Sequence, residues 1–466
     1  MVVGEFAEQR DLVIIGSGPG GYQAAIRAAQ LGKSVTLIEK NKLGGVCLNQ
    51  GCIPSKVFTH AAAKLASVPV MDEMGIGAME TAVDFFTLQQ YKAKIVDRLQ
   101  SGVEALMKSN EIEVLTGKAN FINDHKIGVE NGHQFNLYEF SNAIIATGSH
   151  SNWAGPEHER VLLPESVYQL DEIPESLVIY GNDYRALEAA FSFKLLGSDV
   201  KLFYEHAFPF DDSINRELIR MLKKAKIKVK HGYKLQDVHS DKEKVSVHFS
   251  KEKETVDEKA SYLLVCTEQK PNTEHLGIDR TGVDLTAAGF IRTDHQAQTT
   301  LSHVFAAGDV TGDGFTAVKA IKQGKVAAET IAGLKSEVDL TLIPSVVHTI
   351  PPIATVGLTE KGANAAGYQT ETSSSSMNGN SYAAITNARG GLVTVVKEKE
   401  TDILLGIHMI GSSAIELIST AVTVLEMAGR EEDLVFPSYP HPSFNEGLLE
   451  AVEGLSGMAI HAPKKR

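Results

Sequence analysis

Two segments of the chain share one order of elements: a buried strand, a glycine-rich turn, a helix and a second strand. The first segment runs from Leu12-Val13-Ile14-Ile15 through Gly16-Ser17-Gly18-Pro19-Gly20-Gly21 to a strand that ends at Glu39. Glycines at these spacings permit a tight turn, close approach of a pyrophosphate and close helix–strand packing. A carboxylate 23 residues after Gly16 can accept hydrogen bonds from a ribose. The segment therefore predicts a dinucleotide-binding βαβ unit in a parallel sheet.

The same pattern returns 165 residues later. Leu177-Val178-Ile179-Tyr180-Gly181 matches the first strand and its glycine, and Ala189-Ala190 matches Ala24-Ala25 of the first helix. Internal repetition of this kind indicates a repeated structural unit. We therefore predict a second nucleotide-type unit that begins near residue 176.

The second segment differs from the first at the positions that would contact a ligand. Gly18 corresponds to Asp183, Gly21 to Ala186 and Glu39 to Tyr204. An aspartate beside a pyrophosphate costs about 1 to 4 kcal/mol for one charge pair near 4 Å. Arg185 could offset part of this cost, and Glu205 could replace Tyr204 after a small shift in register. The repeat predicts the fold of the second unit but not its ligand.

A pair of cysteines follows the first fingerprint. Cys47 and Cys52 are two of only three cysteines in 466 residues and lie in an apolar, glycine-flanked segment. A structural disulfide is disfavoured in so cysteine-poor a chain, and no second ligand pair supports zinc or another metal. We interpret the pair as a redox centre, with two inert buried thiols as the alternative. Cys266 fits an ordinary core position in a strand.

Composition limits the classes of function. A length of 466 residues suits about three domains. The formal charge of −13 argues against binding to nucleic acid or to an anionic membrane. No apolar run approaches the ~20 residues that span a bilayer, and the polar N-terminus does not resemble a signal peptide. We therefore expect a cytoplasmic protein.

Later motifs extend the pattern through the chain. They are Gly44-Gly45-Val46-Cys47 through Lys56, Ala146-Thr147-Gly148, Ala307-Gly308-Asp309, and His441-Pro442-Ser443 followed by Glu446. With these motifs the chain resembles, essentially end to end, the FAD-dependent pyridine nucleotide–disulfide oxidoreductases. The cysteine segment and the late His-Pro motif are the most specific parts of this resemblance.

The resemblance implies catalytic roles for four residues. Cys47 would exchange with a dithiol substrate, and Cys52 would face the flavin. His441 would be the acid–base group, oriented by Glu446, and would reach the disulfide from the partner subunit. These roles agree with thiol chemistry, because the thiolate is the nucleophile and a histidine can move its proton.

The resemblance also implies cofactor contacts. Those for FAD would be made by Gly16, Gly18, Gly21, Glu39, Lys56, Gly117, Ala119, Thr147, Gly148, Asp309 and Ala317. On the NAD side only Gly181 and Glu188 match, and Glu188 would pair with the lysine beside the flavin. Glu268 replaces a glycine that lies beside the nicotinamide in the family. We therefore expect FAD binding, with recognition of NAD impaired or altered.

The implied fold is α/β, with two nucleotide-binding Rossmann-like domains and a C-terminal α+β dimerisation domain. We expect an FAD-binding domain at 1–148 and 273–340, an inserted NAD-type domain at 149–272 and an interface domain at 341–466. In the last of these, alternation predicts strands at 391–397 and 403–410, and helical spacing covers 414–427. The run Ser373-Ser374-Ser375-Ser376 is expected to be a loop.

Within the family, Pro54-Ser55-Lys56 follows members that act on dihydrolipoamide, which disfavours glutathione reduction. We expect a homodimer that takes electrons from dihydrolipoamide or a lipoylated protein, with a 2-oxoacid dehydrogenase complex as a candidate host. Electrons would pass to the Cys47–Cys52 disulfide, then to FAD and nominally to NAD. Two alternatives stay open: a non-catalytic or regulatory FAD-binding paralogue docked in such a complex, and a disulfide reductase with another electron partner.

Overall fold

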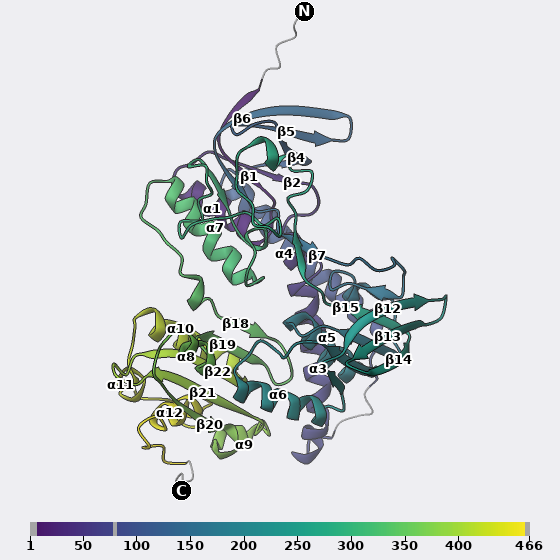
Figure 1. Cartoon of the computed structure of the whole chain (residues 1–466), viewed down its shortest axis with the longest axis vertical. Coiled ribbons are helices and arrows are strands. Elements are labelled where there is room, and N and C mark those ends of the chain that lie inside the picture. The colour runs from purple at the N-terminus through teal and green to yellow at the C-terminus, as the bar shows by residue number, and fades with distance from the viewer. Residues whose placement is uncertain (1–6, 78–81, 462–466) are drawn as a thin grey trace, which may run out of the picture. The chain divides into compact units, whose positions relative to one another are not determined.

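The computed structural model describes residues 7–77 and 82–461 (Figure 1). The described residues form two compact units, each built from separated parts of the chain. The first unit comprises the described residues up to Pro54, together with Thr87–Trp153 and Thr267–Leu340. The second comprises the described parts of 55–86, Ala154–Cys266 and the described residues from Thr341 onward.

The first unit is built on a sheet with the strand order β3-β2-β1-β6-β5-β4, in which β17 also pairs with β6. These strands are β1 (Glu8–Ile15), β2 (Val35–Glu39), β3 (Glu113–Thr116), β4 (Lys118–Phe121), β5 (Lys126–Asn131), β6 (Gln134–Ile145) and β17 (Val304–Ala306). Strands β3, β2, β1, β6 and β17 run parallel, whereas β5 pairs antiparallel with both β6 and β4. The end of β1 is buried as a continuous apolar run, as in parallel sheets covered on both faces.

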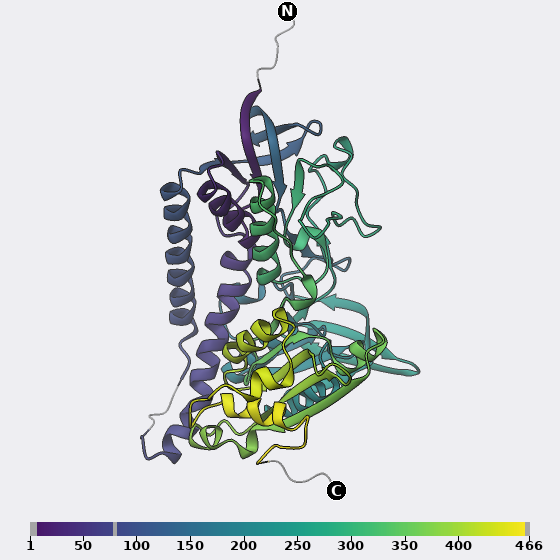
Figure 2. The same cartoon turned by 90° about the vertical axis from the view of Figure 1, so that its left-hand side faces the viewer.

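Two helices lie side by side against this sheet, α1 (Pro19–Gln30) and α7 (Ala317–Ile331) (Figures 1 and 2). Their approach depends on small residues. A Cβ atom at Gly324 of α7 would lie 2.3 Å from the carbonyl oxygen of Gly20 in α1. The unit also contains α2 (Gly45–Asn49), most of α4 (Phe85–Ser109) and the short β7–β16 pair (Ser149–Ser151 and Gln269–Pro271).

The second unit contains a parallel sheet with the order β11-β10-β9-β15-β8 and an antiparallel sheet with the order β12-β13-β14. Their strands are β8 (Val161–Leu162), β9 (Ser176–Tyr180), β10 (Asp199–Tyr204), β11 (Lys228–His231), β12 (Lys234–Ser240), β13 (Val245–Lys251), β14 (Glu254–Ala260) and β15 (Tyr262–Val265). The helices α5 (Tyr184–Leu196), α6 (Asp212–Lys224) and most of α3 (Cys52–Glu73) belong to this unit.

The 165-residue repeat is preserved in the structure. Helix α1 begins at Pro19 and α5 begins at Tyr184, while β2 ends at Glu39 and β10 ends at Tyr204. Both differences equal 165, so Gly18 and Asp183 occupy the same N-cap position of their helices. The predicted second nucleotide-type unit is therefore present.

The C-terminal part of the second unit is an antiparallel sheet with the order β18-β19-β22-β21-β20. Its strands are β18 (Ser345–Val347), β19 (Ile353–Gly357), β20 (Thr370–Ser376), β21 (Gly391–Glu398) and β22 (Leu404–Gly411). The accompanying helices are α8 (Glu360–Ala365), α9 (Ser381–Ile385), α10 (Ala414–Glu426), α11 (Glu431–Val435) and α12 (Asn445–Glu453). An apolar core between the sheet and α10 and α12 includes Ile407, Met409 and Leu448.

One expectation in this region was wrong. The serine run at 373–376 is not a loop but the end of β20, which pairs antiparallel with β21. Backbone hydrogen bonds to β21 hold the strand in place. Its small polar residues lack the alternation of apolar and polar side chains by which a strand is recognised in a sequence. Ser373 is buried, whereas the Ser374 hydroxyl lies 2.8 Å from that of Thr394.

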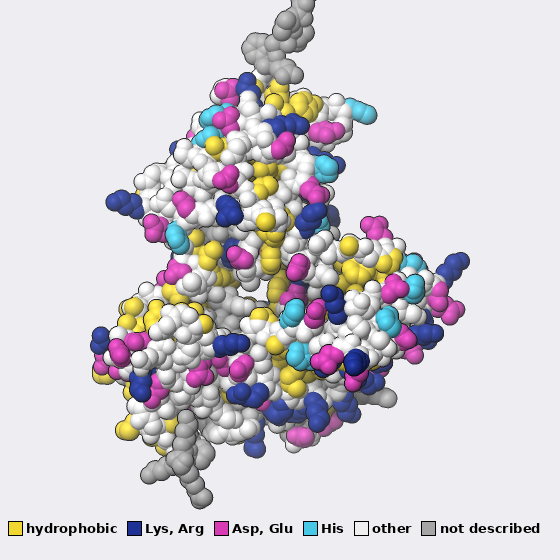
Figure 3. All heavy atoms as spheres, in the orientation of Figure 1, with side chains coloured by type: hydrophobic (Ala, Val, Ile, Leu, Met, Phe, Trp, Pro, Cys, Tyr) yellow, Lys and Arg dark blue, Asp and Glu magenta, His cyan; other side chains and the backbone are white. Residues whose placement is uncertain are grey.

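The structure supports the expected α/β and α+β arrangement, whereas the domain boundaries at 148, 272 and 340 stay predictions. In the described ranges, no helix is long and apolar enough to cross a bilayer. Acidic and basic side chains are interspersed over the face in Figure 3.

Candidate active site

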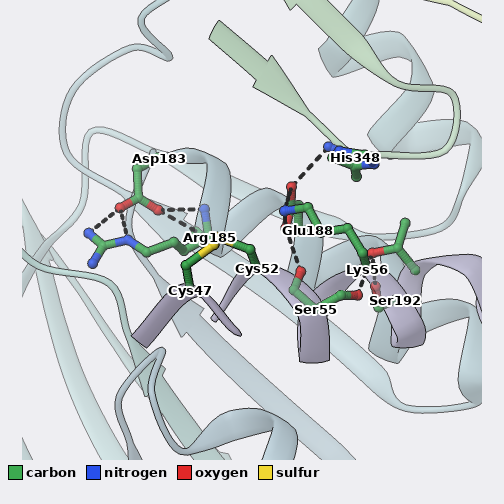
Figure 4. Close-up of polar contacts among 11 residues, drawn as sticks. Cys47, Cys52, Ser55, Lys56, Asp183, Arg185, Glu188, Ser192 and His348 are labelled. Atoms are coloured by element: carbon green, nitrogen blue, oxygen red, sulfur yellow. Dashed lines mark hydrogen bonds and ion pairs between the residues drawn. A yellow bond between two sulfur atoms is a disulfide. The ribbon is translucent and has the colours of Figure 1, made fainter. Parts of the chain in front are cut away.

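The Cys47–Cys52 pair forms a disulfide (Figure 4). Gly44 and Gly45 have φ angles of 95° and 61°, which turn the chain into the short helix α2. The amides of Gln50 and Gly51 then both donate to the carbonyl of Val46, at 2.8 and 2.7 Å. This turn brings the Cα atoms of the two cysteines to 4.5 Å, within the normal range for a disulfide.

The third cysteine has a different environment. Cys266 directly follows β15, is buried and carries a free thiol. Burial raises the pKa of this thiol well above its usual range. Because the thiolate is the reactive form, burial disfavours reaction at Cys266, whereas Cys47 and Cys52 are only half-buried.

Most of the residues expected to bind FAD lie at one edge of the first unit's sheet. Gly16 follows β1, Glu39 ends β2, Gly117 follows β3, Thr147 and Gly148 follow β6, and Asp309 follows β17. These strands are parallel, so their carboxyl ends meet at this edge. Ligands of open α/β sheets bind there.

This edge fits a flavin dinucleotide. A Cβ atom at Gly18 would meet no heavy atom within 4 Å, so the start of α1 is open. The buried hydroxyl of Thr147 has no hydrogen-bond partner among the described residues. The Glu39 carboxylate is fixed by the amide and hydroxyl of Ser17, at 2.8 and 2.6 Å, and by the amide of Asn41 at 2.8 Å.

The other expected FAD residues of this unit lie in α1, β4 and α7. The tight fit at Gly21 explains its glycine, because a Cβ atom there would lie 1.8 Å from the carbonyl oxygen of Gly16. Ala119 lies in β4, and Ala317 is the first residue of α7. The carboxylate of Asp309 accepts a 3.2 Å hydrogen bond from the hydroxyl of Ser149.

Lys56 lies in the second unit, on α3 one turn after Cys52, and pairs with Glu188 of α5 (Figure 4). The ammonium lies 2.8 Å from both carboxylate oxygens of Glu188, whose side chain is 2% exposed. The hydroxyl of Ser55 and the amide of His348 also donate to this carboxylate. The carboxylate of Glu188, expected on the NAD side, is thus held by the lysine, a hydroxyl and a backbone amide.

His348 is a neighbour of the Lys56–Glu188 pair that no motif in the sequence indicated. It follows β18, and its backbone amide lies 3.0 Å from Glu188. Burial, reinforced by the positive charge of Lys56, lowers the pKa of its imidazole. The neutral form of His348 is therefore favoured beside the Lys56–Glu188 pair.

His441 and Glu446 are brought together at the start of α12. The His441 Nδ1 atom lies 2.7 Å from Glu446, whose other oxygen accepts a 2.9 Å hydrogen bond from the amide of Ser443. Burial raises the pKa of Glu446, but the hydrogen bonds from His441 and Ser443 outweigh this effect and hold it below its usual value. The His441 side chain is 73% exposed, so its free nitrogen is open to a partner.

His441 and the disulfide belong to different compact units of one chain. Each has the internal geometry that its chemistry needs, because the carboxylate fixes one imidazole nitrogen and leaves the other for proton transfer.

The second nucleotide-type unit does not fit a dinucleotide in the way the first does. Gly181 is required by the close approach of Cys266, whose carbonyl oxygen would lie 2.6 Å from a Cβ atom there. Strand β10 ends at Tyr204 where β2 ends at Glu39, so no carboxylate stands at this position, and the tyrosine ring is buried and stacks on His231. Asp183 caps α5, and Ala186 is fully buried. Glu268 lies in the first unit, where its carbonyl accepts from the amide of Asn152.

Two family models match the chain, one over its first two-thirds and one over its C-terminal part. Residues 10–324 match the model described as pyridine nucleotide-disulphide oxidoreductase, and residues 343–452 match the dimerisation domain of the same group. A dihydrolipoyl dehydrogenase of Geobacillus stearothermophilus is 36% identical over 468 residues, which are 99% of each chain. A dihydrolipoyl dehydrogenase of Bacillus subtilis strain 168 is 36% identical over 474 residues, covering all of both chains.

Solved structures show the same fold. LpdA from Mycobacterium tuberculosis superposes with a TM-score of 0.89 at 23% identity, covering 96% of this chain and 99% of that one.

Proposed function

The chain belongs to the pyridine nucleotide-disulphide oxidoreductase family and is an FAD-dependent disulfide oxidoreductase, and we propose that its substrate is a dithiol of the dihydrolipoyl type. The Cys47–Cys52 disulfide is the observation that carries this proposal. The full-length relatives named as dihydrolipoyl dehydrogenases support the substrate class.

In the proposed reaction one thiolate of the substrate attacks the Sγ atom of Cys47. The Cys47–Cys52 bond breaks, a mixed disulfide forms on Cys47, and Cys52 leaves as a thiolate. The second thiol of the substrate then attacks the substrate sulfur of the mixed disulfide, whose bond to Cys47 breaks, and Cys47 leaves as a thiolate. The substrate departs as a cyclic disulfide, and the electron pair stays on the two cysteines.

His441 takes the proton of the attacking substrate thiol through the imidazole nitrogen that does not face Glu446. It passes this proton to a departing cysteine thiolate before it accepts the proton of the second substrate thiol. Such positioned proton transfer contributes roughly 10²- to 10⁴-fold to the rate. We propose that this histidine comes from the partner subunit, since it is exposed in the single chain. Exposed apolar side chains in the matched dimerisation region, including Phe436 at 93% and Met427 at 76%, support a dimer.

The residues at the carboxyl edge of the first sheet would hold FAD, which when bound supplies an acceptor for the electron pair of the dithiol. Gly18 would leave room for the pyrophosphate, and Glu39 would accept from a ribose. Lys56, held by Glu188, would lie beside the flavin ring. No step is assigned to NAD, because the second unit does not fit it in the usual way.

The natural reductant is proposed to be a lipoyl group carried on a protein of a 2-oxoacid dehydrogenase complex. We also propose a cytoplasmic location, which the scarcity of cysteine supports. The alternative of a non-catalytic FAD-binding paralogue is not favoured, because the disulfide, the lysine pair and the His441–Glu446 pair are all formed.

Rapid mixing of the flavin-loaded protein with reductants tests the substrate class. We expect dihydrolipoamide, which closes a cyclic disulfide, to change the flavin absorbance at least a hundredfold faster than glutathione at equal thiol concentration. Equal rates for the two thiols, or a faster reaction with glutathione, would contradict the assignment.

A further inference from the structure

The start of helix α5 is occupied by the chain's own carboxylate (Figure 4). Asp183 is the N-cap residue, and its Oδ1 atom accepts hydrogen bonds from the amides of Arg185 and Ala186 at 2.9 and 3.0 Å. Its Oδ2 atom accepts a 2.6 Å hydrogen bond from Nε of Arg185 and also forms an ion pair with that guanidinium. The Asp183 carboxylate thus binds two backbone amides at the start of the helix and the guanidinium group of Arg185.

The matching position in the first unit is open. Gly18 is the N-cap of α1 and makes no side-chain cap, and a Cβ atom there would meet nothing within 4 Å. Free amides at a helix N-terminus bind phosphate, and an arginine binds it through two parallel hydrogen bonds. In α5 the groups of both kinds are already bound to Asp183.

The family implies a pyridine nucleotide at this βαβ unit, but the residues present do not fit it. We propose that Asp183 is an internal substitute for a phosphate of the nucleotide. It occupies the amides of α5 and the guanidinium of Arg185, so a pyridine nucleotide binds weakly and only by displacing it. Asp183 therefore sets the nucleotide affinity of this chain.

The chemistry of displacement supports weak binding. A phosphate can replace the carboxylate on both partners, because both are oxyanions that accept from amides and guanidinium groups. The displaced carboxylate stays on the same N-cap residue and repels the phosphate from short range. Tyr204 has no carboxylate that could accept from the ribose, and its ring is buried against Phe208 and His231.

Titration calorimetry of the oxidised, flavin-loaded protein with NAD⁺ tests the proposal, since NAD⁺ cannot reduce the flavin. We expect Asp183→Asn to tighten NAD⁺ binding at least fivefold, because the charge is lost while the capping oxygen remains. Asp183→Gly, which restores the residue of the first repeat, should tighten it at least tenfold, or about 1.4 kcal/mol.

Asp211→Asn is the matched control. Asp211 caps α6 in the same unit through the amide of Ser213, at 2.9 Å, and is not part of the nucleotide position. Its substitution should leave NAD⁺ affinity within twofold of the wild type. A comparable gain in NAD⁺ affinity in this variant would show that the loss of any capping aspartate in the unit raises the affinity, and would overturn the proposal.

Folding is monitored by circular dichroism, and Asp183→Asn carries the test if the glycine variant does not fold, since asparagine caps helices as well as aspartate. Unchanged or weaker NAD⁺ affinity in the folded variants would overturn the proposal, as would no binding by any of the proteins at millimolar NAD⁺. The inference is independent of the dithiol assignment, because no dithiol is present. If the NAD⁺ titrations contradict the role of Asp183 while dihydrolipoamide still reduces the flavin, the proposed function is unaffected.

Discussion

At the scale of single residues, the three cysteines differ in the reactivity that their surroundings allow. Cys47 and Cys52 lie half-buried in a disulfide, whereas burial raises the pKa of the Cys266 thiol. After reduction by a dithiol, the protein should therefore expose two reactive thiols. Iodoacetamide at pH ~9, where an ordinary thiol is largely ionised, is expected to label Cys47 and Cys52 but not Cys266.

Mass spectrometry of the digested protein measures this labelling. Unfolding in urea provides the control, because Cys266 should then react as fast as the other two. Labelling of Cys266 in the native protein at the rate of Cys47 would contradict its protected environment.

The sequence predicted the identity of the redox pair because two close cysteines in a cysteine-poor chain carry a chemical signal of their own. Of the partners of Glu188 it predicted Lys56 but not the other two. Ser55, on the helix of Lys56, and the backbone amide of His348, 160 residues away, join it through tertiary packing. A backbone donor cannot be recognised from the identity of its side chain. The capping role of Asp183 could have been recognised, since an aspartate directly before a helix is a common N-cap.

At the scale of secondary-structure elements, helix α1 begins after a glycine that the fold itself does not need and that we propose faces the pyrophosphate of FAD. An alanine Cβ atom at Gly18 would meet nothing within 4 Å, and the φ angle of −62° suits alanine. Gly18→Ala should therefore fold normally but weaken FAD binding at least tenfold, because the methyl group occupies the approach of the pyrophosphate. Fluorescence titration of the deflavinated protein with FAD measures this affinity.

Gly102→Ala is the matched control in helix α4. Gly102 is exposed, and a Cβ atom there also meets nothing within 4 Å. This change should leave FAD affinity unaltered and stabilise the helix by about 0.5 to 1 kcal/mol. Equal effects of the two substitutions on FAD binding would refute the role given to Gly18.

Helices α3 and α5 are joined by the Lys56–Glu188 pair. Removing one partner of a buried ion pair costs about 3–5 kcal/mol. Since the Lys56 side chain is 30% exposed, we expect Glu188→Gln to lower the free energy of unfolding by about 2 kcal/mol. Urea denaturation followed by circular dichroism provides the measurement.

The comparison variant is Glu217→Gln, which breaks the ion pair with the 53% exposed Arg220 on α6. An exposed pair three residues apart on a helix is worth about 0.2–0.5 kcal/mol. A loss at Glu188 no larger than the loss at Glu217 would show that the buried pair does not stabilise the packing of α3 against α5.

At this scale the sequence predicted most of the structure. The helix expected at 414–427 is α10, which ends at Glu426, and the strands expected at 391–397 and 403–410 are β21 and β22. These elements have strong apolar periodicity. Strand β20 lacks it, since it lies at the sheet edge and is held by backbone pairing, and it was therefore mistaken for a loop.

At the scale of the whole molecule, the account needs two subunits for one complete site. A hybrid dimer of one Cys47→Ser subunit and one His441→Gln subunit tests this arrangement. If the histidine acts on the partner's disulfide, the hybrid retains one intact pair of Cys47 and His441. It should then show about half the activity of the wild-type dimer, although each parent homodimer has almost none.

Two affinity tags allow the hybrid to be purified from co-expressed subunits. If the histidine instead served the disulfide of its own chain, both sites of the hybrid would carry a defect. An inactive hybrid would therefore contradict the shared site.

The central claim is that electrons from a dithiol reach FAD only through Cys47 and Cys52. Anaerobic mixing of the flavin-loaded protein with dihydrolipoamide, followed by flavin absorbance, tests it directly when wild type and Cys47→Ser are compared. We predict rapid spectral change in the wild type and none in Cys47→Ser, while dithionite reduces the flavin of both. Equal reduction of the two flavins by dihydrolipoamide would contradict it.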